Sequence, residues 1–177
     1  MKLIDPLTIT DAVFDIASSN VPENDNALWL VGTAYTVGQK VMMTTGVHKN
    51  FECLIANTGQ DPSTNPMNGT PLPYWLDLGA TNRWAMFDSV VGNQTTNTTS
   101  IVFKLTPGEI INSISLLNAS GLTAQIVGND PTEGEFYNQT FDLISTEEIV
   151  DGYTYFFNGF VTKPDIVALN IPPYSSA

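Results

Sequence analysis

The stretch AYTVGQKVMMTTGVHKNFECLIANTG, residues 34–59, sets the expected fold class of the chain. In it, short runs rich in β-branched and aromatic residues alternate with glycine-containing turns, which is typical of short antiparallel strands. Glycine suits these turns because it adopts positive φ angles without a steric penalty. The predicted strands are 34–37, 40–43 and 49–55, separated by turns at Val37-Gly38 and Thr45-Gly46.

Large aromatic side chains are concentrated around this stretch, between residues 27 and 80. A sheet this small has too little aliphatic area for a core, and aromatic side chains supply the missing burial area. We therefore predict a small aromatic-rich antiparallel module over residues 27–80. Its predicted core residues are Trp29, Val41, Phe51 and Cys53.

The segment that precedes the module, residues 1–26, is interpreted as an N-terminal arm or attachment segment. Its second part, residues 18–26, is rich in Ser, Asn, Pro and acidic residues, which favour turns and loops. Two outcomes stay open for this segment: docking on a neighbouring molecule, or packing on the chain's own domain.

Residues 81–177 carry longer strand candidates, separated by turn signals at intervals of about 8–12 residues, a spacing typical of sandwiches and jelly rolls. The candidates are 100–105, 110–118, 123–127, 139–144, 153–160 and 166–171. We therefore predict an all-β chain, in which the module is followed by a jelly-roll-like β-sandwich over residues 81–177.

Charge and hydropathy exclude several classes of partner. The 177 residues carry a net charge of −12, and the six basic residues are scattered along the chain. Nucleic-acid binding needs Lys and Arg to neutralise phosphates, so we expect no nucleic-acid partner. Anionic membrane surfaces are disfavoured for the same reason. Because no run of 18 apolar residues occurs, we also expect no membrane insertion.

The sequence does not predict an enzyme. His48 is the only histidine, and we expect it to be an exposed turn residue. Its odd offset from Cys53 would put the two side chains on opposite faces of a strand, so they cannot act as a pair. Cys53 is the only cysteine, which excludes a disulfide within the chain and a Cys-rich metal site. We expect no catalytic residues, no metal site and no cofactor.

The module resembles the small chitin-binding modules of secreted chitinases and cellulases. The shared pattern, which covers roughly a third of the chain, is Trp29, Tyr35-x-x-Gly38-x-x-Val41, Phe51-x-Cys53, Asn57-x-Gly59-x-x-Pro62 and Trp75. Such modules stack exposed aromatic rings on sugar faces. The resemblance therefore implies Tyr35, Tyr74 and Trp75 as carbohydrate-binding residues. Two departures, Phe51 in place of the usual Tyr and the long loop of residues 63–73, favour aromatic residues that serve mainly as core.

The next block, YWLDLGATNRWAMFD at residues 74–88, resembles a segment of tailed-phage virion proteins in which such a module runs directly into a β-sandwich. The resemblance implies a virion structural protein of the tail, baseplate or neck. Its expected partners are other virion proteins, copies of itself and a host glycan. The N-terminus lacks an apolar signal core, so we expect synthesis in the host cytoplasm without a signal peptide, followed by location in the virion.

Arg83 is the only arginine of this acidic chain, and we interpret it, with Trp84, as a contact between the module and the sandwich. Its guanidinium would pair with Asp77 or Asp88 and stack on Trp84.

Two points on function and completeness stay open. In related phage chains we expect further strands after the region of residues 171–174, so either the sandwich is short or a partner subunit supplies a strand. A stand-alone carbohydrate-binding protein is the alternative function. A glycoside hydrolase fragment is a third hypothesis, which requires two carboxylates about 5–10 Å apart in a cleft.

Overall fold

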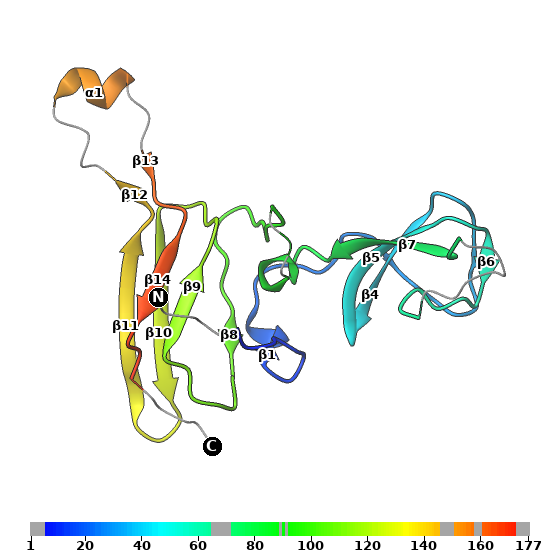
Figure 1. Ribbon diagram of the computed structural model, residues 1–177, viewed down its shortest axis with the longest axis horizontal. Coiled ribbons are helices and arrows are strands. Elements are labelled where there is room, and N and C mark those ends of the chain that lie inside the picture. Colours follow the sequence, from blue (N-terminus) through cyan, green and yellow to red (C-terminus); the bar gives the residue numbers. More distant parts are fainter. Residues whose placement is uncertain are drawn as a thin grey trace. The chain divides into compact units, whose positions relative to one another are not determined.

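The computed structural model describes residues 6–64, 72–88, 90, 92–145, 151–157 and 161–172. Over these residues the chain is mostly β, arranged in several small sheets, none of which closes into a barrel (Figure 1). The chain divides into two compact units. The aromatic unit is Thr8–Thr106, and the C-terminal unit is Pro107–Ala177 together with Met1–Leu7. This division lies at Thr106, and not at the predicted boundary after residue 80.

The aromatic unit is built on a four-stranded sheet with the order β2-β4-β5-β7. The strands of the whole unit are β1 (Phe14–Asp15), β2 (Ala27–Leu28), β3 (Ala34–Tyr35), β4 (Lys40–Thr45), β5 (Val47–Cys53), β6 (Asn57–Thr58), β7 (Trp75–Ala80) and β8 (Lys104–Leu105). Short 3₁₀ helices lie at Ile16–Ser18 and Ala85–Phe87. Gly46, with φ at 70°, makes the tight turn from β4 into β5, as the sequence predicts. Pairing is antiparallel except between β2 and β4.

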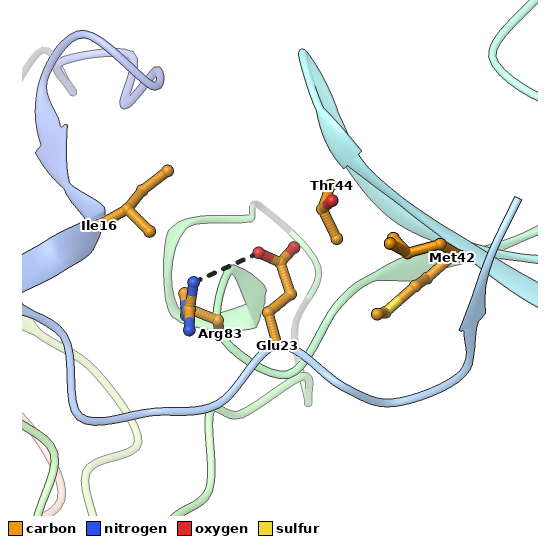
Figure 2. Close-up of a pocket in the computed structure, with 6 residues that line it drawn as sticks. Ile16, Glu23, Met42, Thr44 and Arg83 are labelled. Carbon is orange, nitrogen blue, oxygen red and sulfur yellow. Dashed lines mark ion pairs between the residues drawn. The ribbon is translucent and has the colours of Figure 1, made fainter.

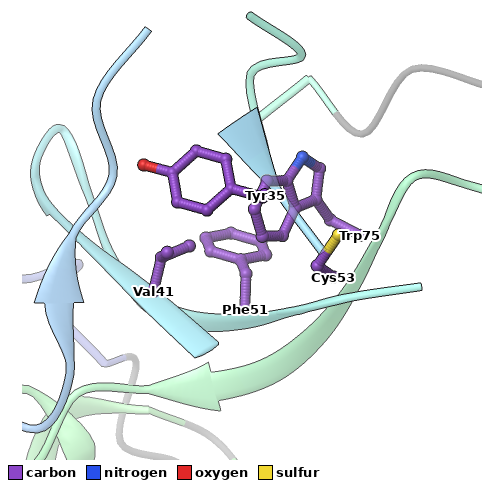
Figure 3. Close-up of a cluster of buried hydrophobic side chains, with 5 residues drawn as sticks. All are labelled: Tyr35, Val41, Phe51, Cys53 and Trp75. Carbon is purple, nitrogen blue, oxygen red and sulfur yellow. The ribbon is translucent and has the colours of Figure 1, made fainter. Parts of the chain in front are cut away.

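One face of this sheet carries the aromatic core (Figure 3). The register pairs Val41 with Phe51 and Cys53 with Trp75, which puts all four side chains on the same face. Tyr35 completes the buried cluster, and its ring meets that of Trp75 edge-on at 5.2 Å. Val41, Phe51 and Cys53 are thus buried together, as the sequence predicts. The fourth predicted core residue, Trp29, packs against the cluster.

The N-terminal segment, residues 8–26, packs on the aromatic unit and is not a detached arm. Phe14 and Val21 are almost fully buried, at 1% and 0% exposure. Strand β1 pairs with β8, and the ring of Phe14 lies edge-on to Trp84 at 5.1 Å and to Phe87 at 5.3 Å. Of the two outcomes that the sequence leaves open, the structure shows packing on the chain's own domain. These contacts also explain why residues 81–106 belong to this unit.

The C-terminal unit consists of two-stranded antiparallel sheets over its described residues: β9 with β14, β10 with β11, and β12 with β13. The strands are β9 (Ser113–Leu116), β10 (Thr123–Asp130), β11 (Gly134–Asp142), β12 (Ile144–Ser145), β13 (Val161–Thr162) and β14 (Ile166–Leu169). The β10–β11 hairpin is the largest element (Figure 1). Leu143, Ile166, Ala168 and Ile171 are the buried apolar residues of this unit.

A short helix, α1 (Gly152–Phe157), replaces most of the strand predicted for residues 153–160. The remainder of that range lies outside the described residues. Aromatic residues favour strands, but a strand needs a neighbour to pair with, and α1 lies beyond the short β12–β13 pair (Figure 1). Helical spacing makes Tyr153 and Phe157 neighbours on α1, and their ring centroids lie 4.7 Å apart. No described helix is long or apolar enough to cross a membrane.

Gly128 has a packing role in the β10–β11 hairpin that predicts a large response to substitution. A Cβ atom at this position would lie 2.6 Å from two ring carbons of Phe136 and 3.2 Å from Cβ of Tyr137. We expect Gly128→Ala to lower the free energy of unfolding of the C-terminal unit by about 1–3 kcal/mol, measured by urea denaturation. Gly152→Ala is the matched control, because a Cβ there meets nothing within 4 Å. Equal stability of the two variants would contradict this packing.

Candidate functional site

The face of the sheet opposite the aromatic core carries a buried polar cluster centred on His48. This side chain lies on β5 and is only 8% exposed as a residue. Its Nδ1 lies 2.8 Å from Oε1 of Glu23, and its Nε2 lies 2.6 Å from Oδ1 of Asp11. The prediction of an exposed turn residue is therefore wrong. The odd offset from Cys53 does place His48 on the face opposite the aromatic core. His48 is nevertheless buried, because the N-terminal segment covers this face.

Both ring nitrogens of His48 thus lie within hydrogen-bond distance of a carboxylate oxygen. A neutral imidazole carries one nitrogen without hydrogen, and that nitrogen would face a carboxylate oxygen, which only accepts when ionised. Both contacts are satisfied when both ring nitrogens donate, as they do in the imidazolium form. The ring also stacks on Trp84, with centroids 4.0 Å apart and planes 18° from parallel. A cation is favoured in this position over an indole face.

Glu23 joins the imidazole to the single arginine. Its Oε1 also accepts a hydrogen bond of 2.8 Å from the Thr81 hydroxyl, and its Oε2 lies 3.5 Å from Nη1 of Arg83. The Glu23 side chain is only 6% exposed. Arg83 in turn donates from Nε to the backbone carbonyl of Val21 at 2.6 Å. Glu23 thus lies between His48 and Arg83 where it has little access to water, while Asp11 contacts the other side of the imidazole with its side chain 45% exposed.

Arg83 and Trp84 differ from their predicted roles. Arg83 pairs with Glu23, whereas Asp77 pairs with Lys49 at 2.6 Å and Asp88 accepts from the side chain of Asn93. Trp84 stacks on His48, a partner that the sequence does not suggest. Within this one unit, the contacts of Arg83 and Trp84 hold the N-terminal segment against the sheet. The segment itself supplies the carboxylate, Glu23, that pairs with Arg83. This corrects the predicted contact between module and sandwich.

A pocket of about 290 Å³ lies beside this cluster (Figure 2). Glu23 and Arg83 meet in its middle, with Ile16 on one side and Met42 and Thr44 on the other. Leu28 completes the lining. The pocket therefore combines an internally paired charge with apolar walls.

The predicted sugar-binding residues do not form an exposed stacking surface. Trp75 is 0% exposed, and its indole nitrogen donates to the carbonyl of Gln60 at 2.9 Å. Tyr35 is 7% exposed, and its hydroxyl oxygen accepts from the Leu30 amide at 2.7 Å. Tyr74 is half-buried and packs against the same core. Because a pyranose stacks on an accessible ring face, burial corrects the assignment of Tyr35 and Trp75 and gives them a core role.

His48, Asp11 and Glu23 are not arranged around a common point. The two carboxylates lie at opposite ring nitrogens, so no single ion could contact all three side chains. Across the described residues, no group of three or more His, Cys, Asp and Glu side chains is placed to hold a metal ion.

Burial makes Cys53 a testable probe of the core. Its thiol donates to the Ile55 carbonyl at 3.2 Å, and burial raises the pKa of the thiol above its ordinary value of 9.0. We expect the native protein to react with a thiol reagent far more slowly than the unfolded chain, because only the thiolate attacks. Because the pKa of the thiol is higher in the folded protein, the unfolded chain loses this proton first as the pH rises. The contribution of the buried neutral thiol to stability is therefore complete below pH 9.0 and is lost as the pH rises further.

Two measurements check this prediction: the rate of thiol labelling with and without denaturant, and the unfolding midpoint of wild type and Cys53→Ala above pH 9.0. Equal labelling rates for native and unfolded protein would show that Cys53 is accessible.

Comparisons of the chain with protein-family models, with curated proteins and with solved structures give no match.

Proposed function

We propose that the chain is a non-enzymatic structural subunit of a tailed-phage virion, of the tail, baseplate or neck, and that it acts by assembling with other virion proteins and with copies of itself. The block of residues 74–88 supports the proposal through its resemblance to virion proteins in which a chitin-binding-like module, as residues 29–75 resemble, runs into a β-sandwich. The proposal includes a jelly-roll-like sandwich in the C-terminal unit, completed by strands of neighbouring subunits.

The two-stranded sheets of the C-terminal unit are the observation that carries this proposal. Over the described residues, each sheet of that unit pairs only two strands. Two-stranded sheets are at best marginally stable in water, and unpaired edges accept strands from other chains. A subunit that exchanges strands with its neighbours in an assembly meets both requirements.

The outer face of the β9–β14 sheet combines exposed apolar side chains of β14 with Ser113 and Ser115 of β9. Along β14, Ile166 and Ala168 are buried, while Val167 and Leu169 between and after them are 49% and 44% exposed. The nearby Leu117 is 71% exposed. Apolar side chains gathered on one face of a small sheet favour contact with another protein surface.

The low charge content agrees with the same role. Only 14% of the residues are charged, against about 25% in ordinary soluble domains. Surfaces with few charges lose little solvation energy when a neighbouring subunit covers them. Burial of Tyr35 and Trp75 favours assembly over the alternative of a stand-alone carbohydrate-binding protein, because it removes two of the three expected stacking residues.

The proposal is tested by the mass of a β14 variant in solution. We expect the wild-type chain to form an oligomer, and Val167→Thr with Leu169→Thr to shift it toward monomer while circular dichroism keeps its β signal. Threonine retains strand propensity and removes apolar contact area. The control is Val31→Thr with Val37→Thr, at positions that are each 67% exposed in the aromatic unit. If the β14 variant kept the wild-type mass, this face would not be an assembly surface.

A further inference from the structure

We propose that His48, Asp11 and Glu23 form a proton-controlled latch, which holds the N-terminal segment on the aromatic unit and lets it open when His48 loses a proton. The inference concerns this unit alone and does not depend on the virion assignment.

Both carboxylates of the latch come from the N-terminal segment, and the imidazole comes from the sheet. Asp11 lies near the beginning of the segment and Glu23 near its end, 37 and 25 residues before His48. The segment therefore places a hydrogen-bond acceptor at each of the two ring nitrogens of the imidazole. Asp11 has a second contact with the same hairpin, since its Oδ2 accepts from the Gly46 amide at 3.3 Å.

Charges on the surrounding elements do not replace the proton of His48. From residues 81–84, Arg83 faces Glu23 and Trp84 covers the imidazole. On β4, the residue opposite His48 is the neutral Thr44. The next residue along β5, Lys49, is paired with Asp77 of β7 and is half exposed.

Asp25, the remaining carboxylate of the segment in this region, accepts hydrogen bonds from the amide of Asn82 and the side chain of Asn50. The imidazolium and Arg83 are thus the two cations that face the carboxylates of Asp11 and Glu23.

Loss of the His48 proton would remove one of the two cations that face the carboxylates of Asp11 and Glu23. One ring nitrogen would then face a carboxylate oxygen with no hydrogen between them, and the buried Glu23 would keep only Arg83 as a cationic partner. An uncompensated buried carboxylate is unfavourable, and opening the segment returns it to water.

The other attachments of the segment involve few backbone hydrogen bonds. Strand β1 pairs with β8 over two residues, the buried anchors are Phe14 and Val21, and mainly side-chain hydrogen bonds join Ser18 and Asn20 to residues 97–104. Segments with few backbone hydrogen bonds open at lower free energy than the rest of a fold. Opening exposes both anchors, so the latch decides whether this segment packs on its own unit or offers an apolar arm to a neighbour.

The latch can be tested on the full chain by nitrogen-15 NMR, because His48 is the only histidine. At low pH we expect both ring nitrogens to show imidazolium shifts. As the pH rises, proton loss and faster amide exchange of residues 8–26 should follow the same curve. After correction for intrinsic exchange, the increase should be roughly ten- to hundredfold, the equivalent of one lost charged hydrogen bond. A neutral ring at all pH values, or proton loss without faster exchange, would overturn the proposal.

A pair of matched variants separates the latch from general electrostatic effects. Asp11→Asn removes one acceptor charge at the imidazole while its side chain, 45% exposed, tolerates replacement, and we expect segment opening to move to lower pH. Asp77→Asn removes a carboxylate of similar exposure, 42%, that pairs with the neighbouring Lys49. It should leave the opening curve unchanged. Equal shifts in both variants would show that overall charge, and not the latch, controls the segment.

Discussion

Trp75→Ala is expected to destabilise the aromatic unit strongly. Trp75 is 0% exposed, contacts Tyr35 edge-on at 5.2 Å and donates to the Gln60 carbonyl. Truncation of a buried Trp to Ala costs about 3–5 kcal/mol, because it combines lost burial with a cavity. Small domains have total stabilities of about 5–15 kcal/mol, so this loss removes a large part of the folding free energy. Urea denaturation followed by circular dichroism measures it.

Leu76→Ala is the matched control for Trp75→Ala. Leu76 is the next residue on β7 and is 45% exposed, so its truncation should change stability by no more than about 0.5 kcal/mol. A folded and stable Trp75→Ala protein that had lost affinity for chitin would contradict the core role and would restore the sugar-stacking assignment.

Glu23→Ala is expected to have a similarly large effect, for an electrostatic reason. Glu23 is bonded to His48, Thr81 and Arg83, with its side chain 6% exposed. Removing one member of a buried charged group leaves the others uncompensated and costs about 3–5 kcal/mol. The expected result is a lower urea midpoint for the aromatic unit at neutral pH, with a lower protease resistance of the N-terminal segment.

Glu52→Ala distinguishes this network from ordinary surface pairing. Glu52 pairs with Lys40 at 3.9 Å, and the two side chains are 31% and 53% exposed. Exposed pairs contribute no more than about 1 kcal/mol. If Glu23→Ala were as mild as Glu52→Ala, the cluster around His48 would not stabilise the unit.

The sequence predicts the aromatic sheet because the determining signals are local. Strands β4 and β5 coincide with two runs of β-forming residues, and Gly46 marks the turn between them. The aromatic motif also predicts which side chains are buried, since a small sheet has few other residues large enough to fill its core. The motif does not predict whether Tyr35 and Trp75 are buried or exposed, because the same aromatic ring can pack in a core or stack on a sugar.

The His48 cluster could not be predicted from local patterns. Asp11 and Glu23 lie in loops, and nothing in the spacing of a single sequence indicates which distant loop will cover a given strand. One signal was present: a chain of net charge −12 has a single His and a single Arg. Two scarce cations in an acidic chain favour carboxylate partners, but the sequence offers many of these. Likewise, the aromatic residues of α1 have strand propensity, and local sequence does not indicate their helical conformation.

The mass of the purified wild-type chain in solution, measured by light scattering over a wide range of protein concentration, tests the assembly role most directly. From the two-stranded sheets described in the C-terminal unit, the assembly proposal predicts an oligomer of defined mass, such as a trimer or a hexamer. A chain that stays monomeric at every concentration would contradict self-assembly through these sheets.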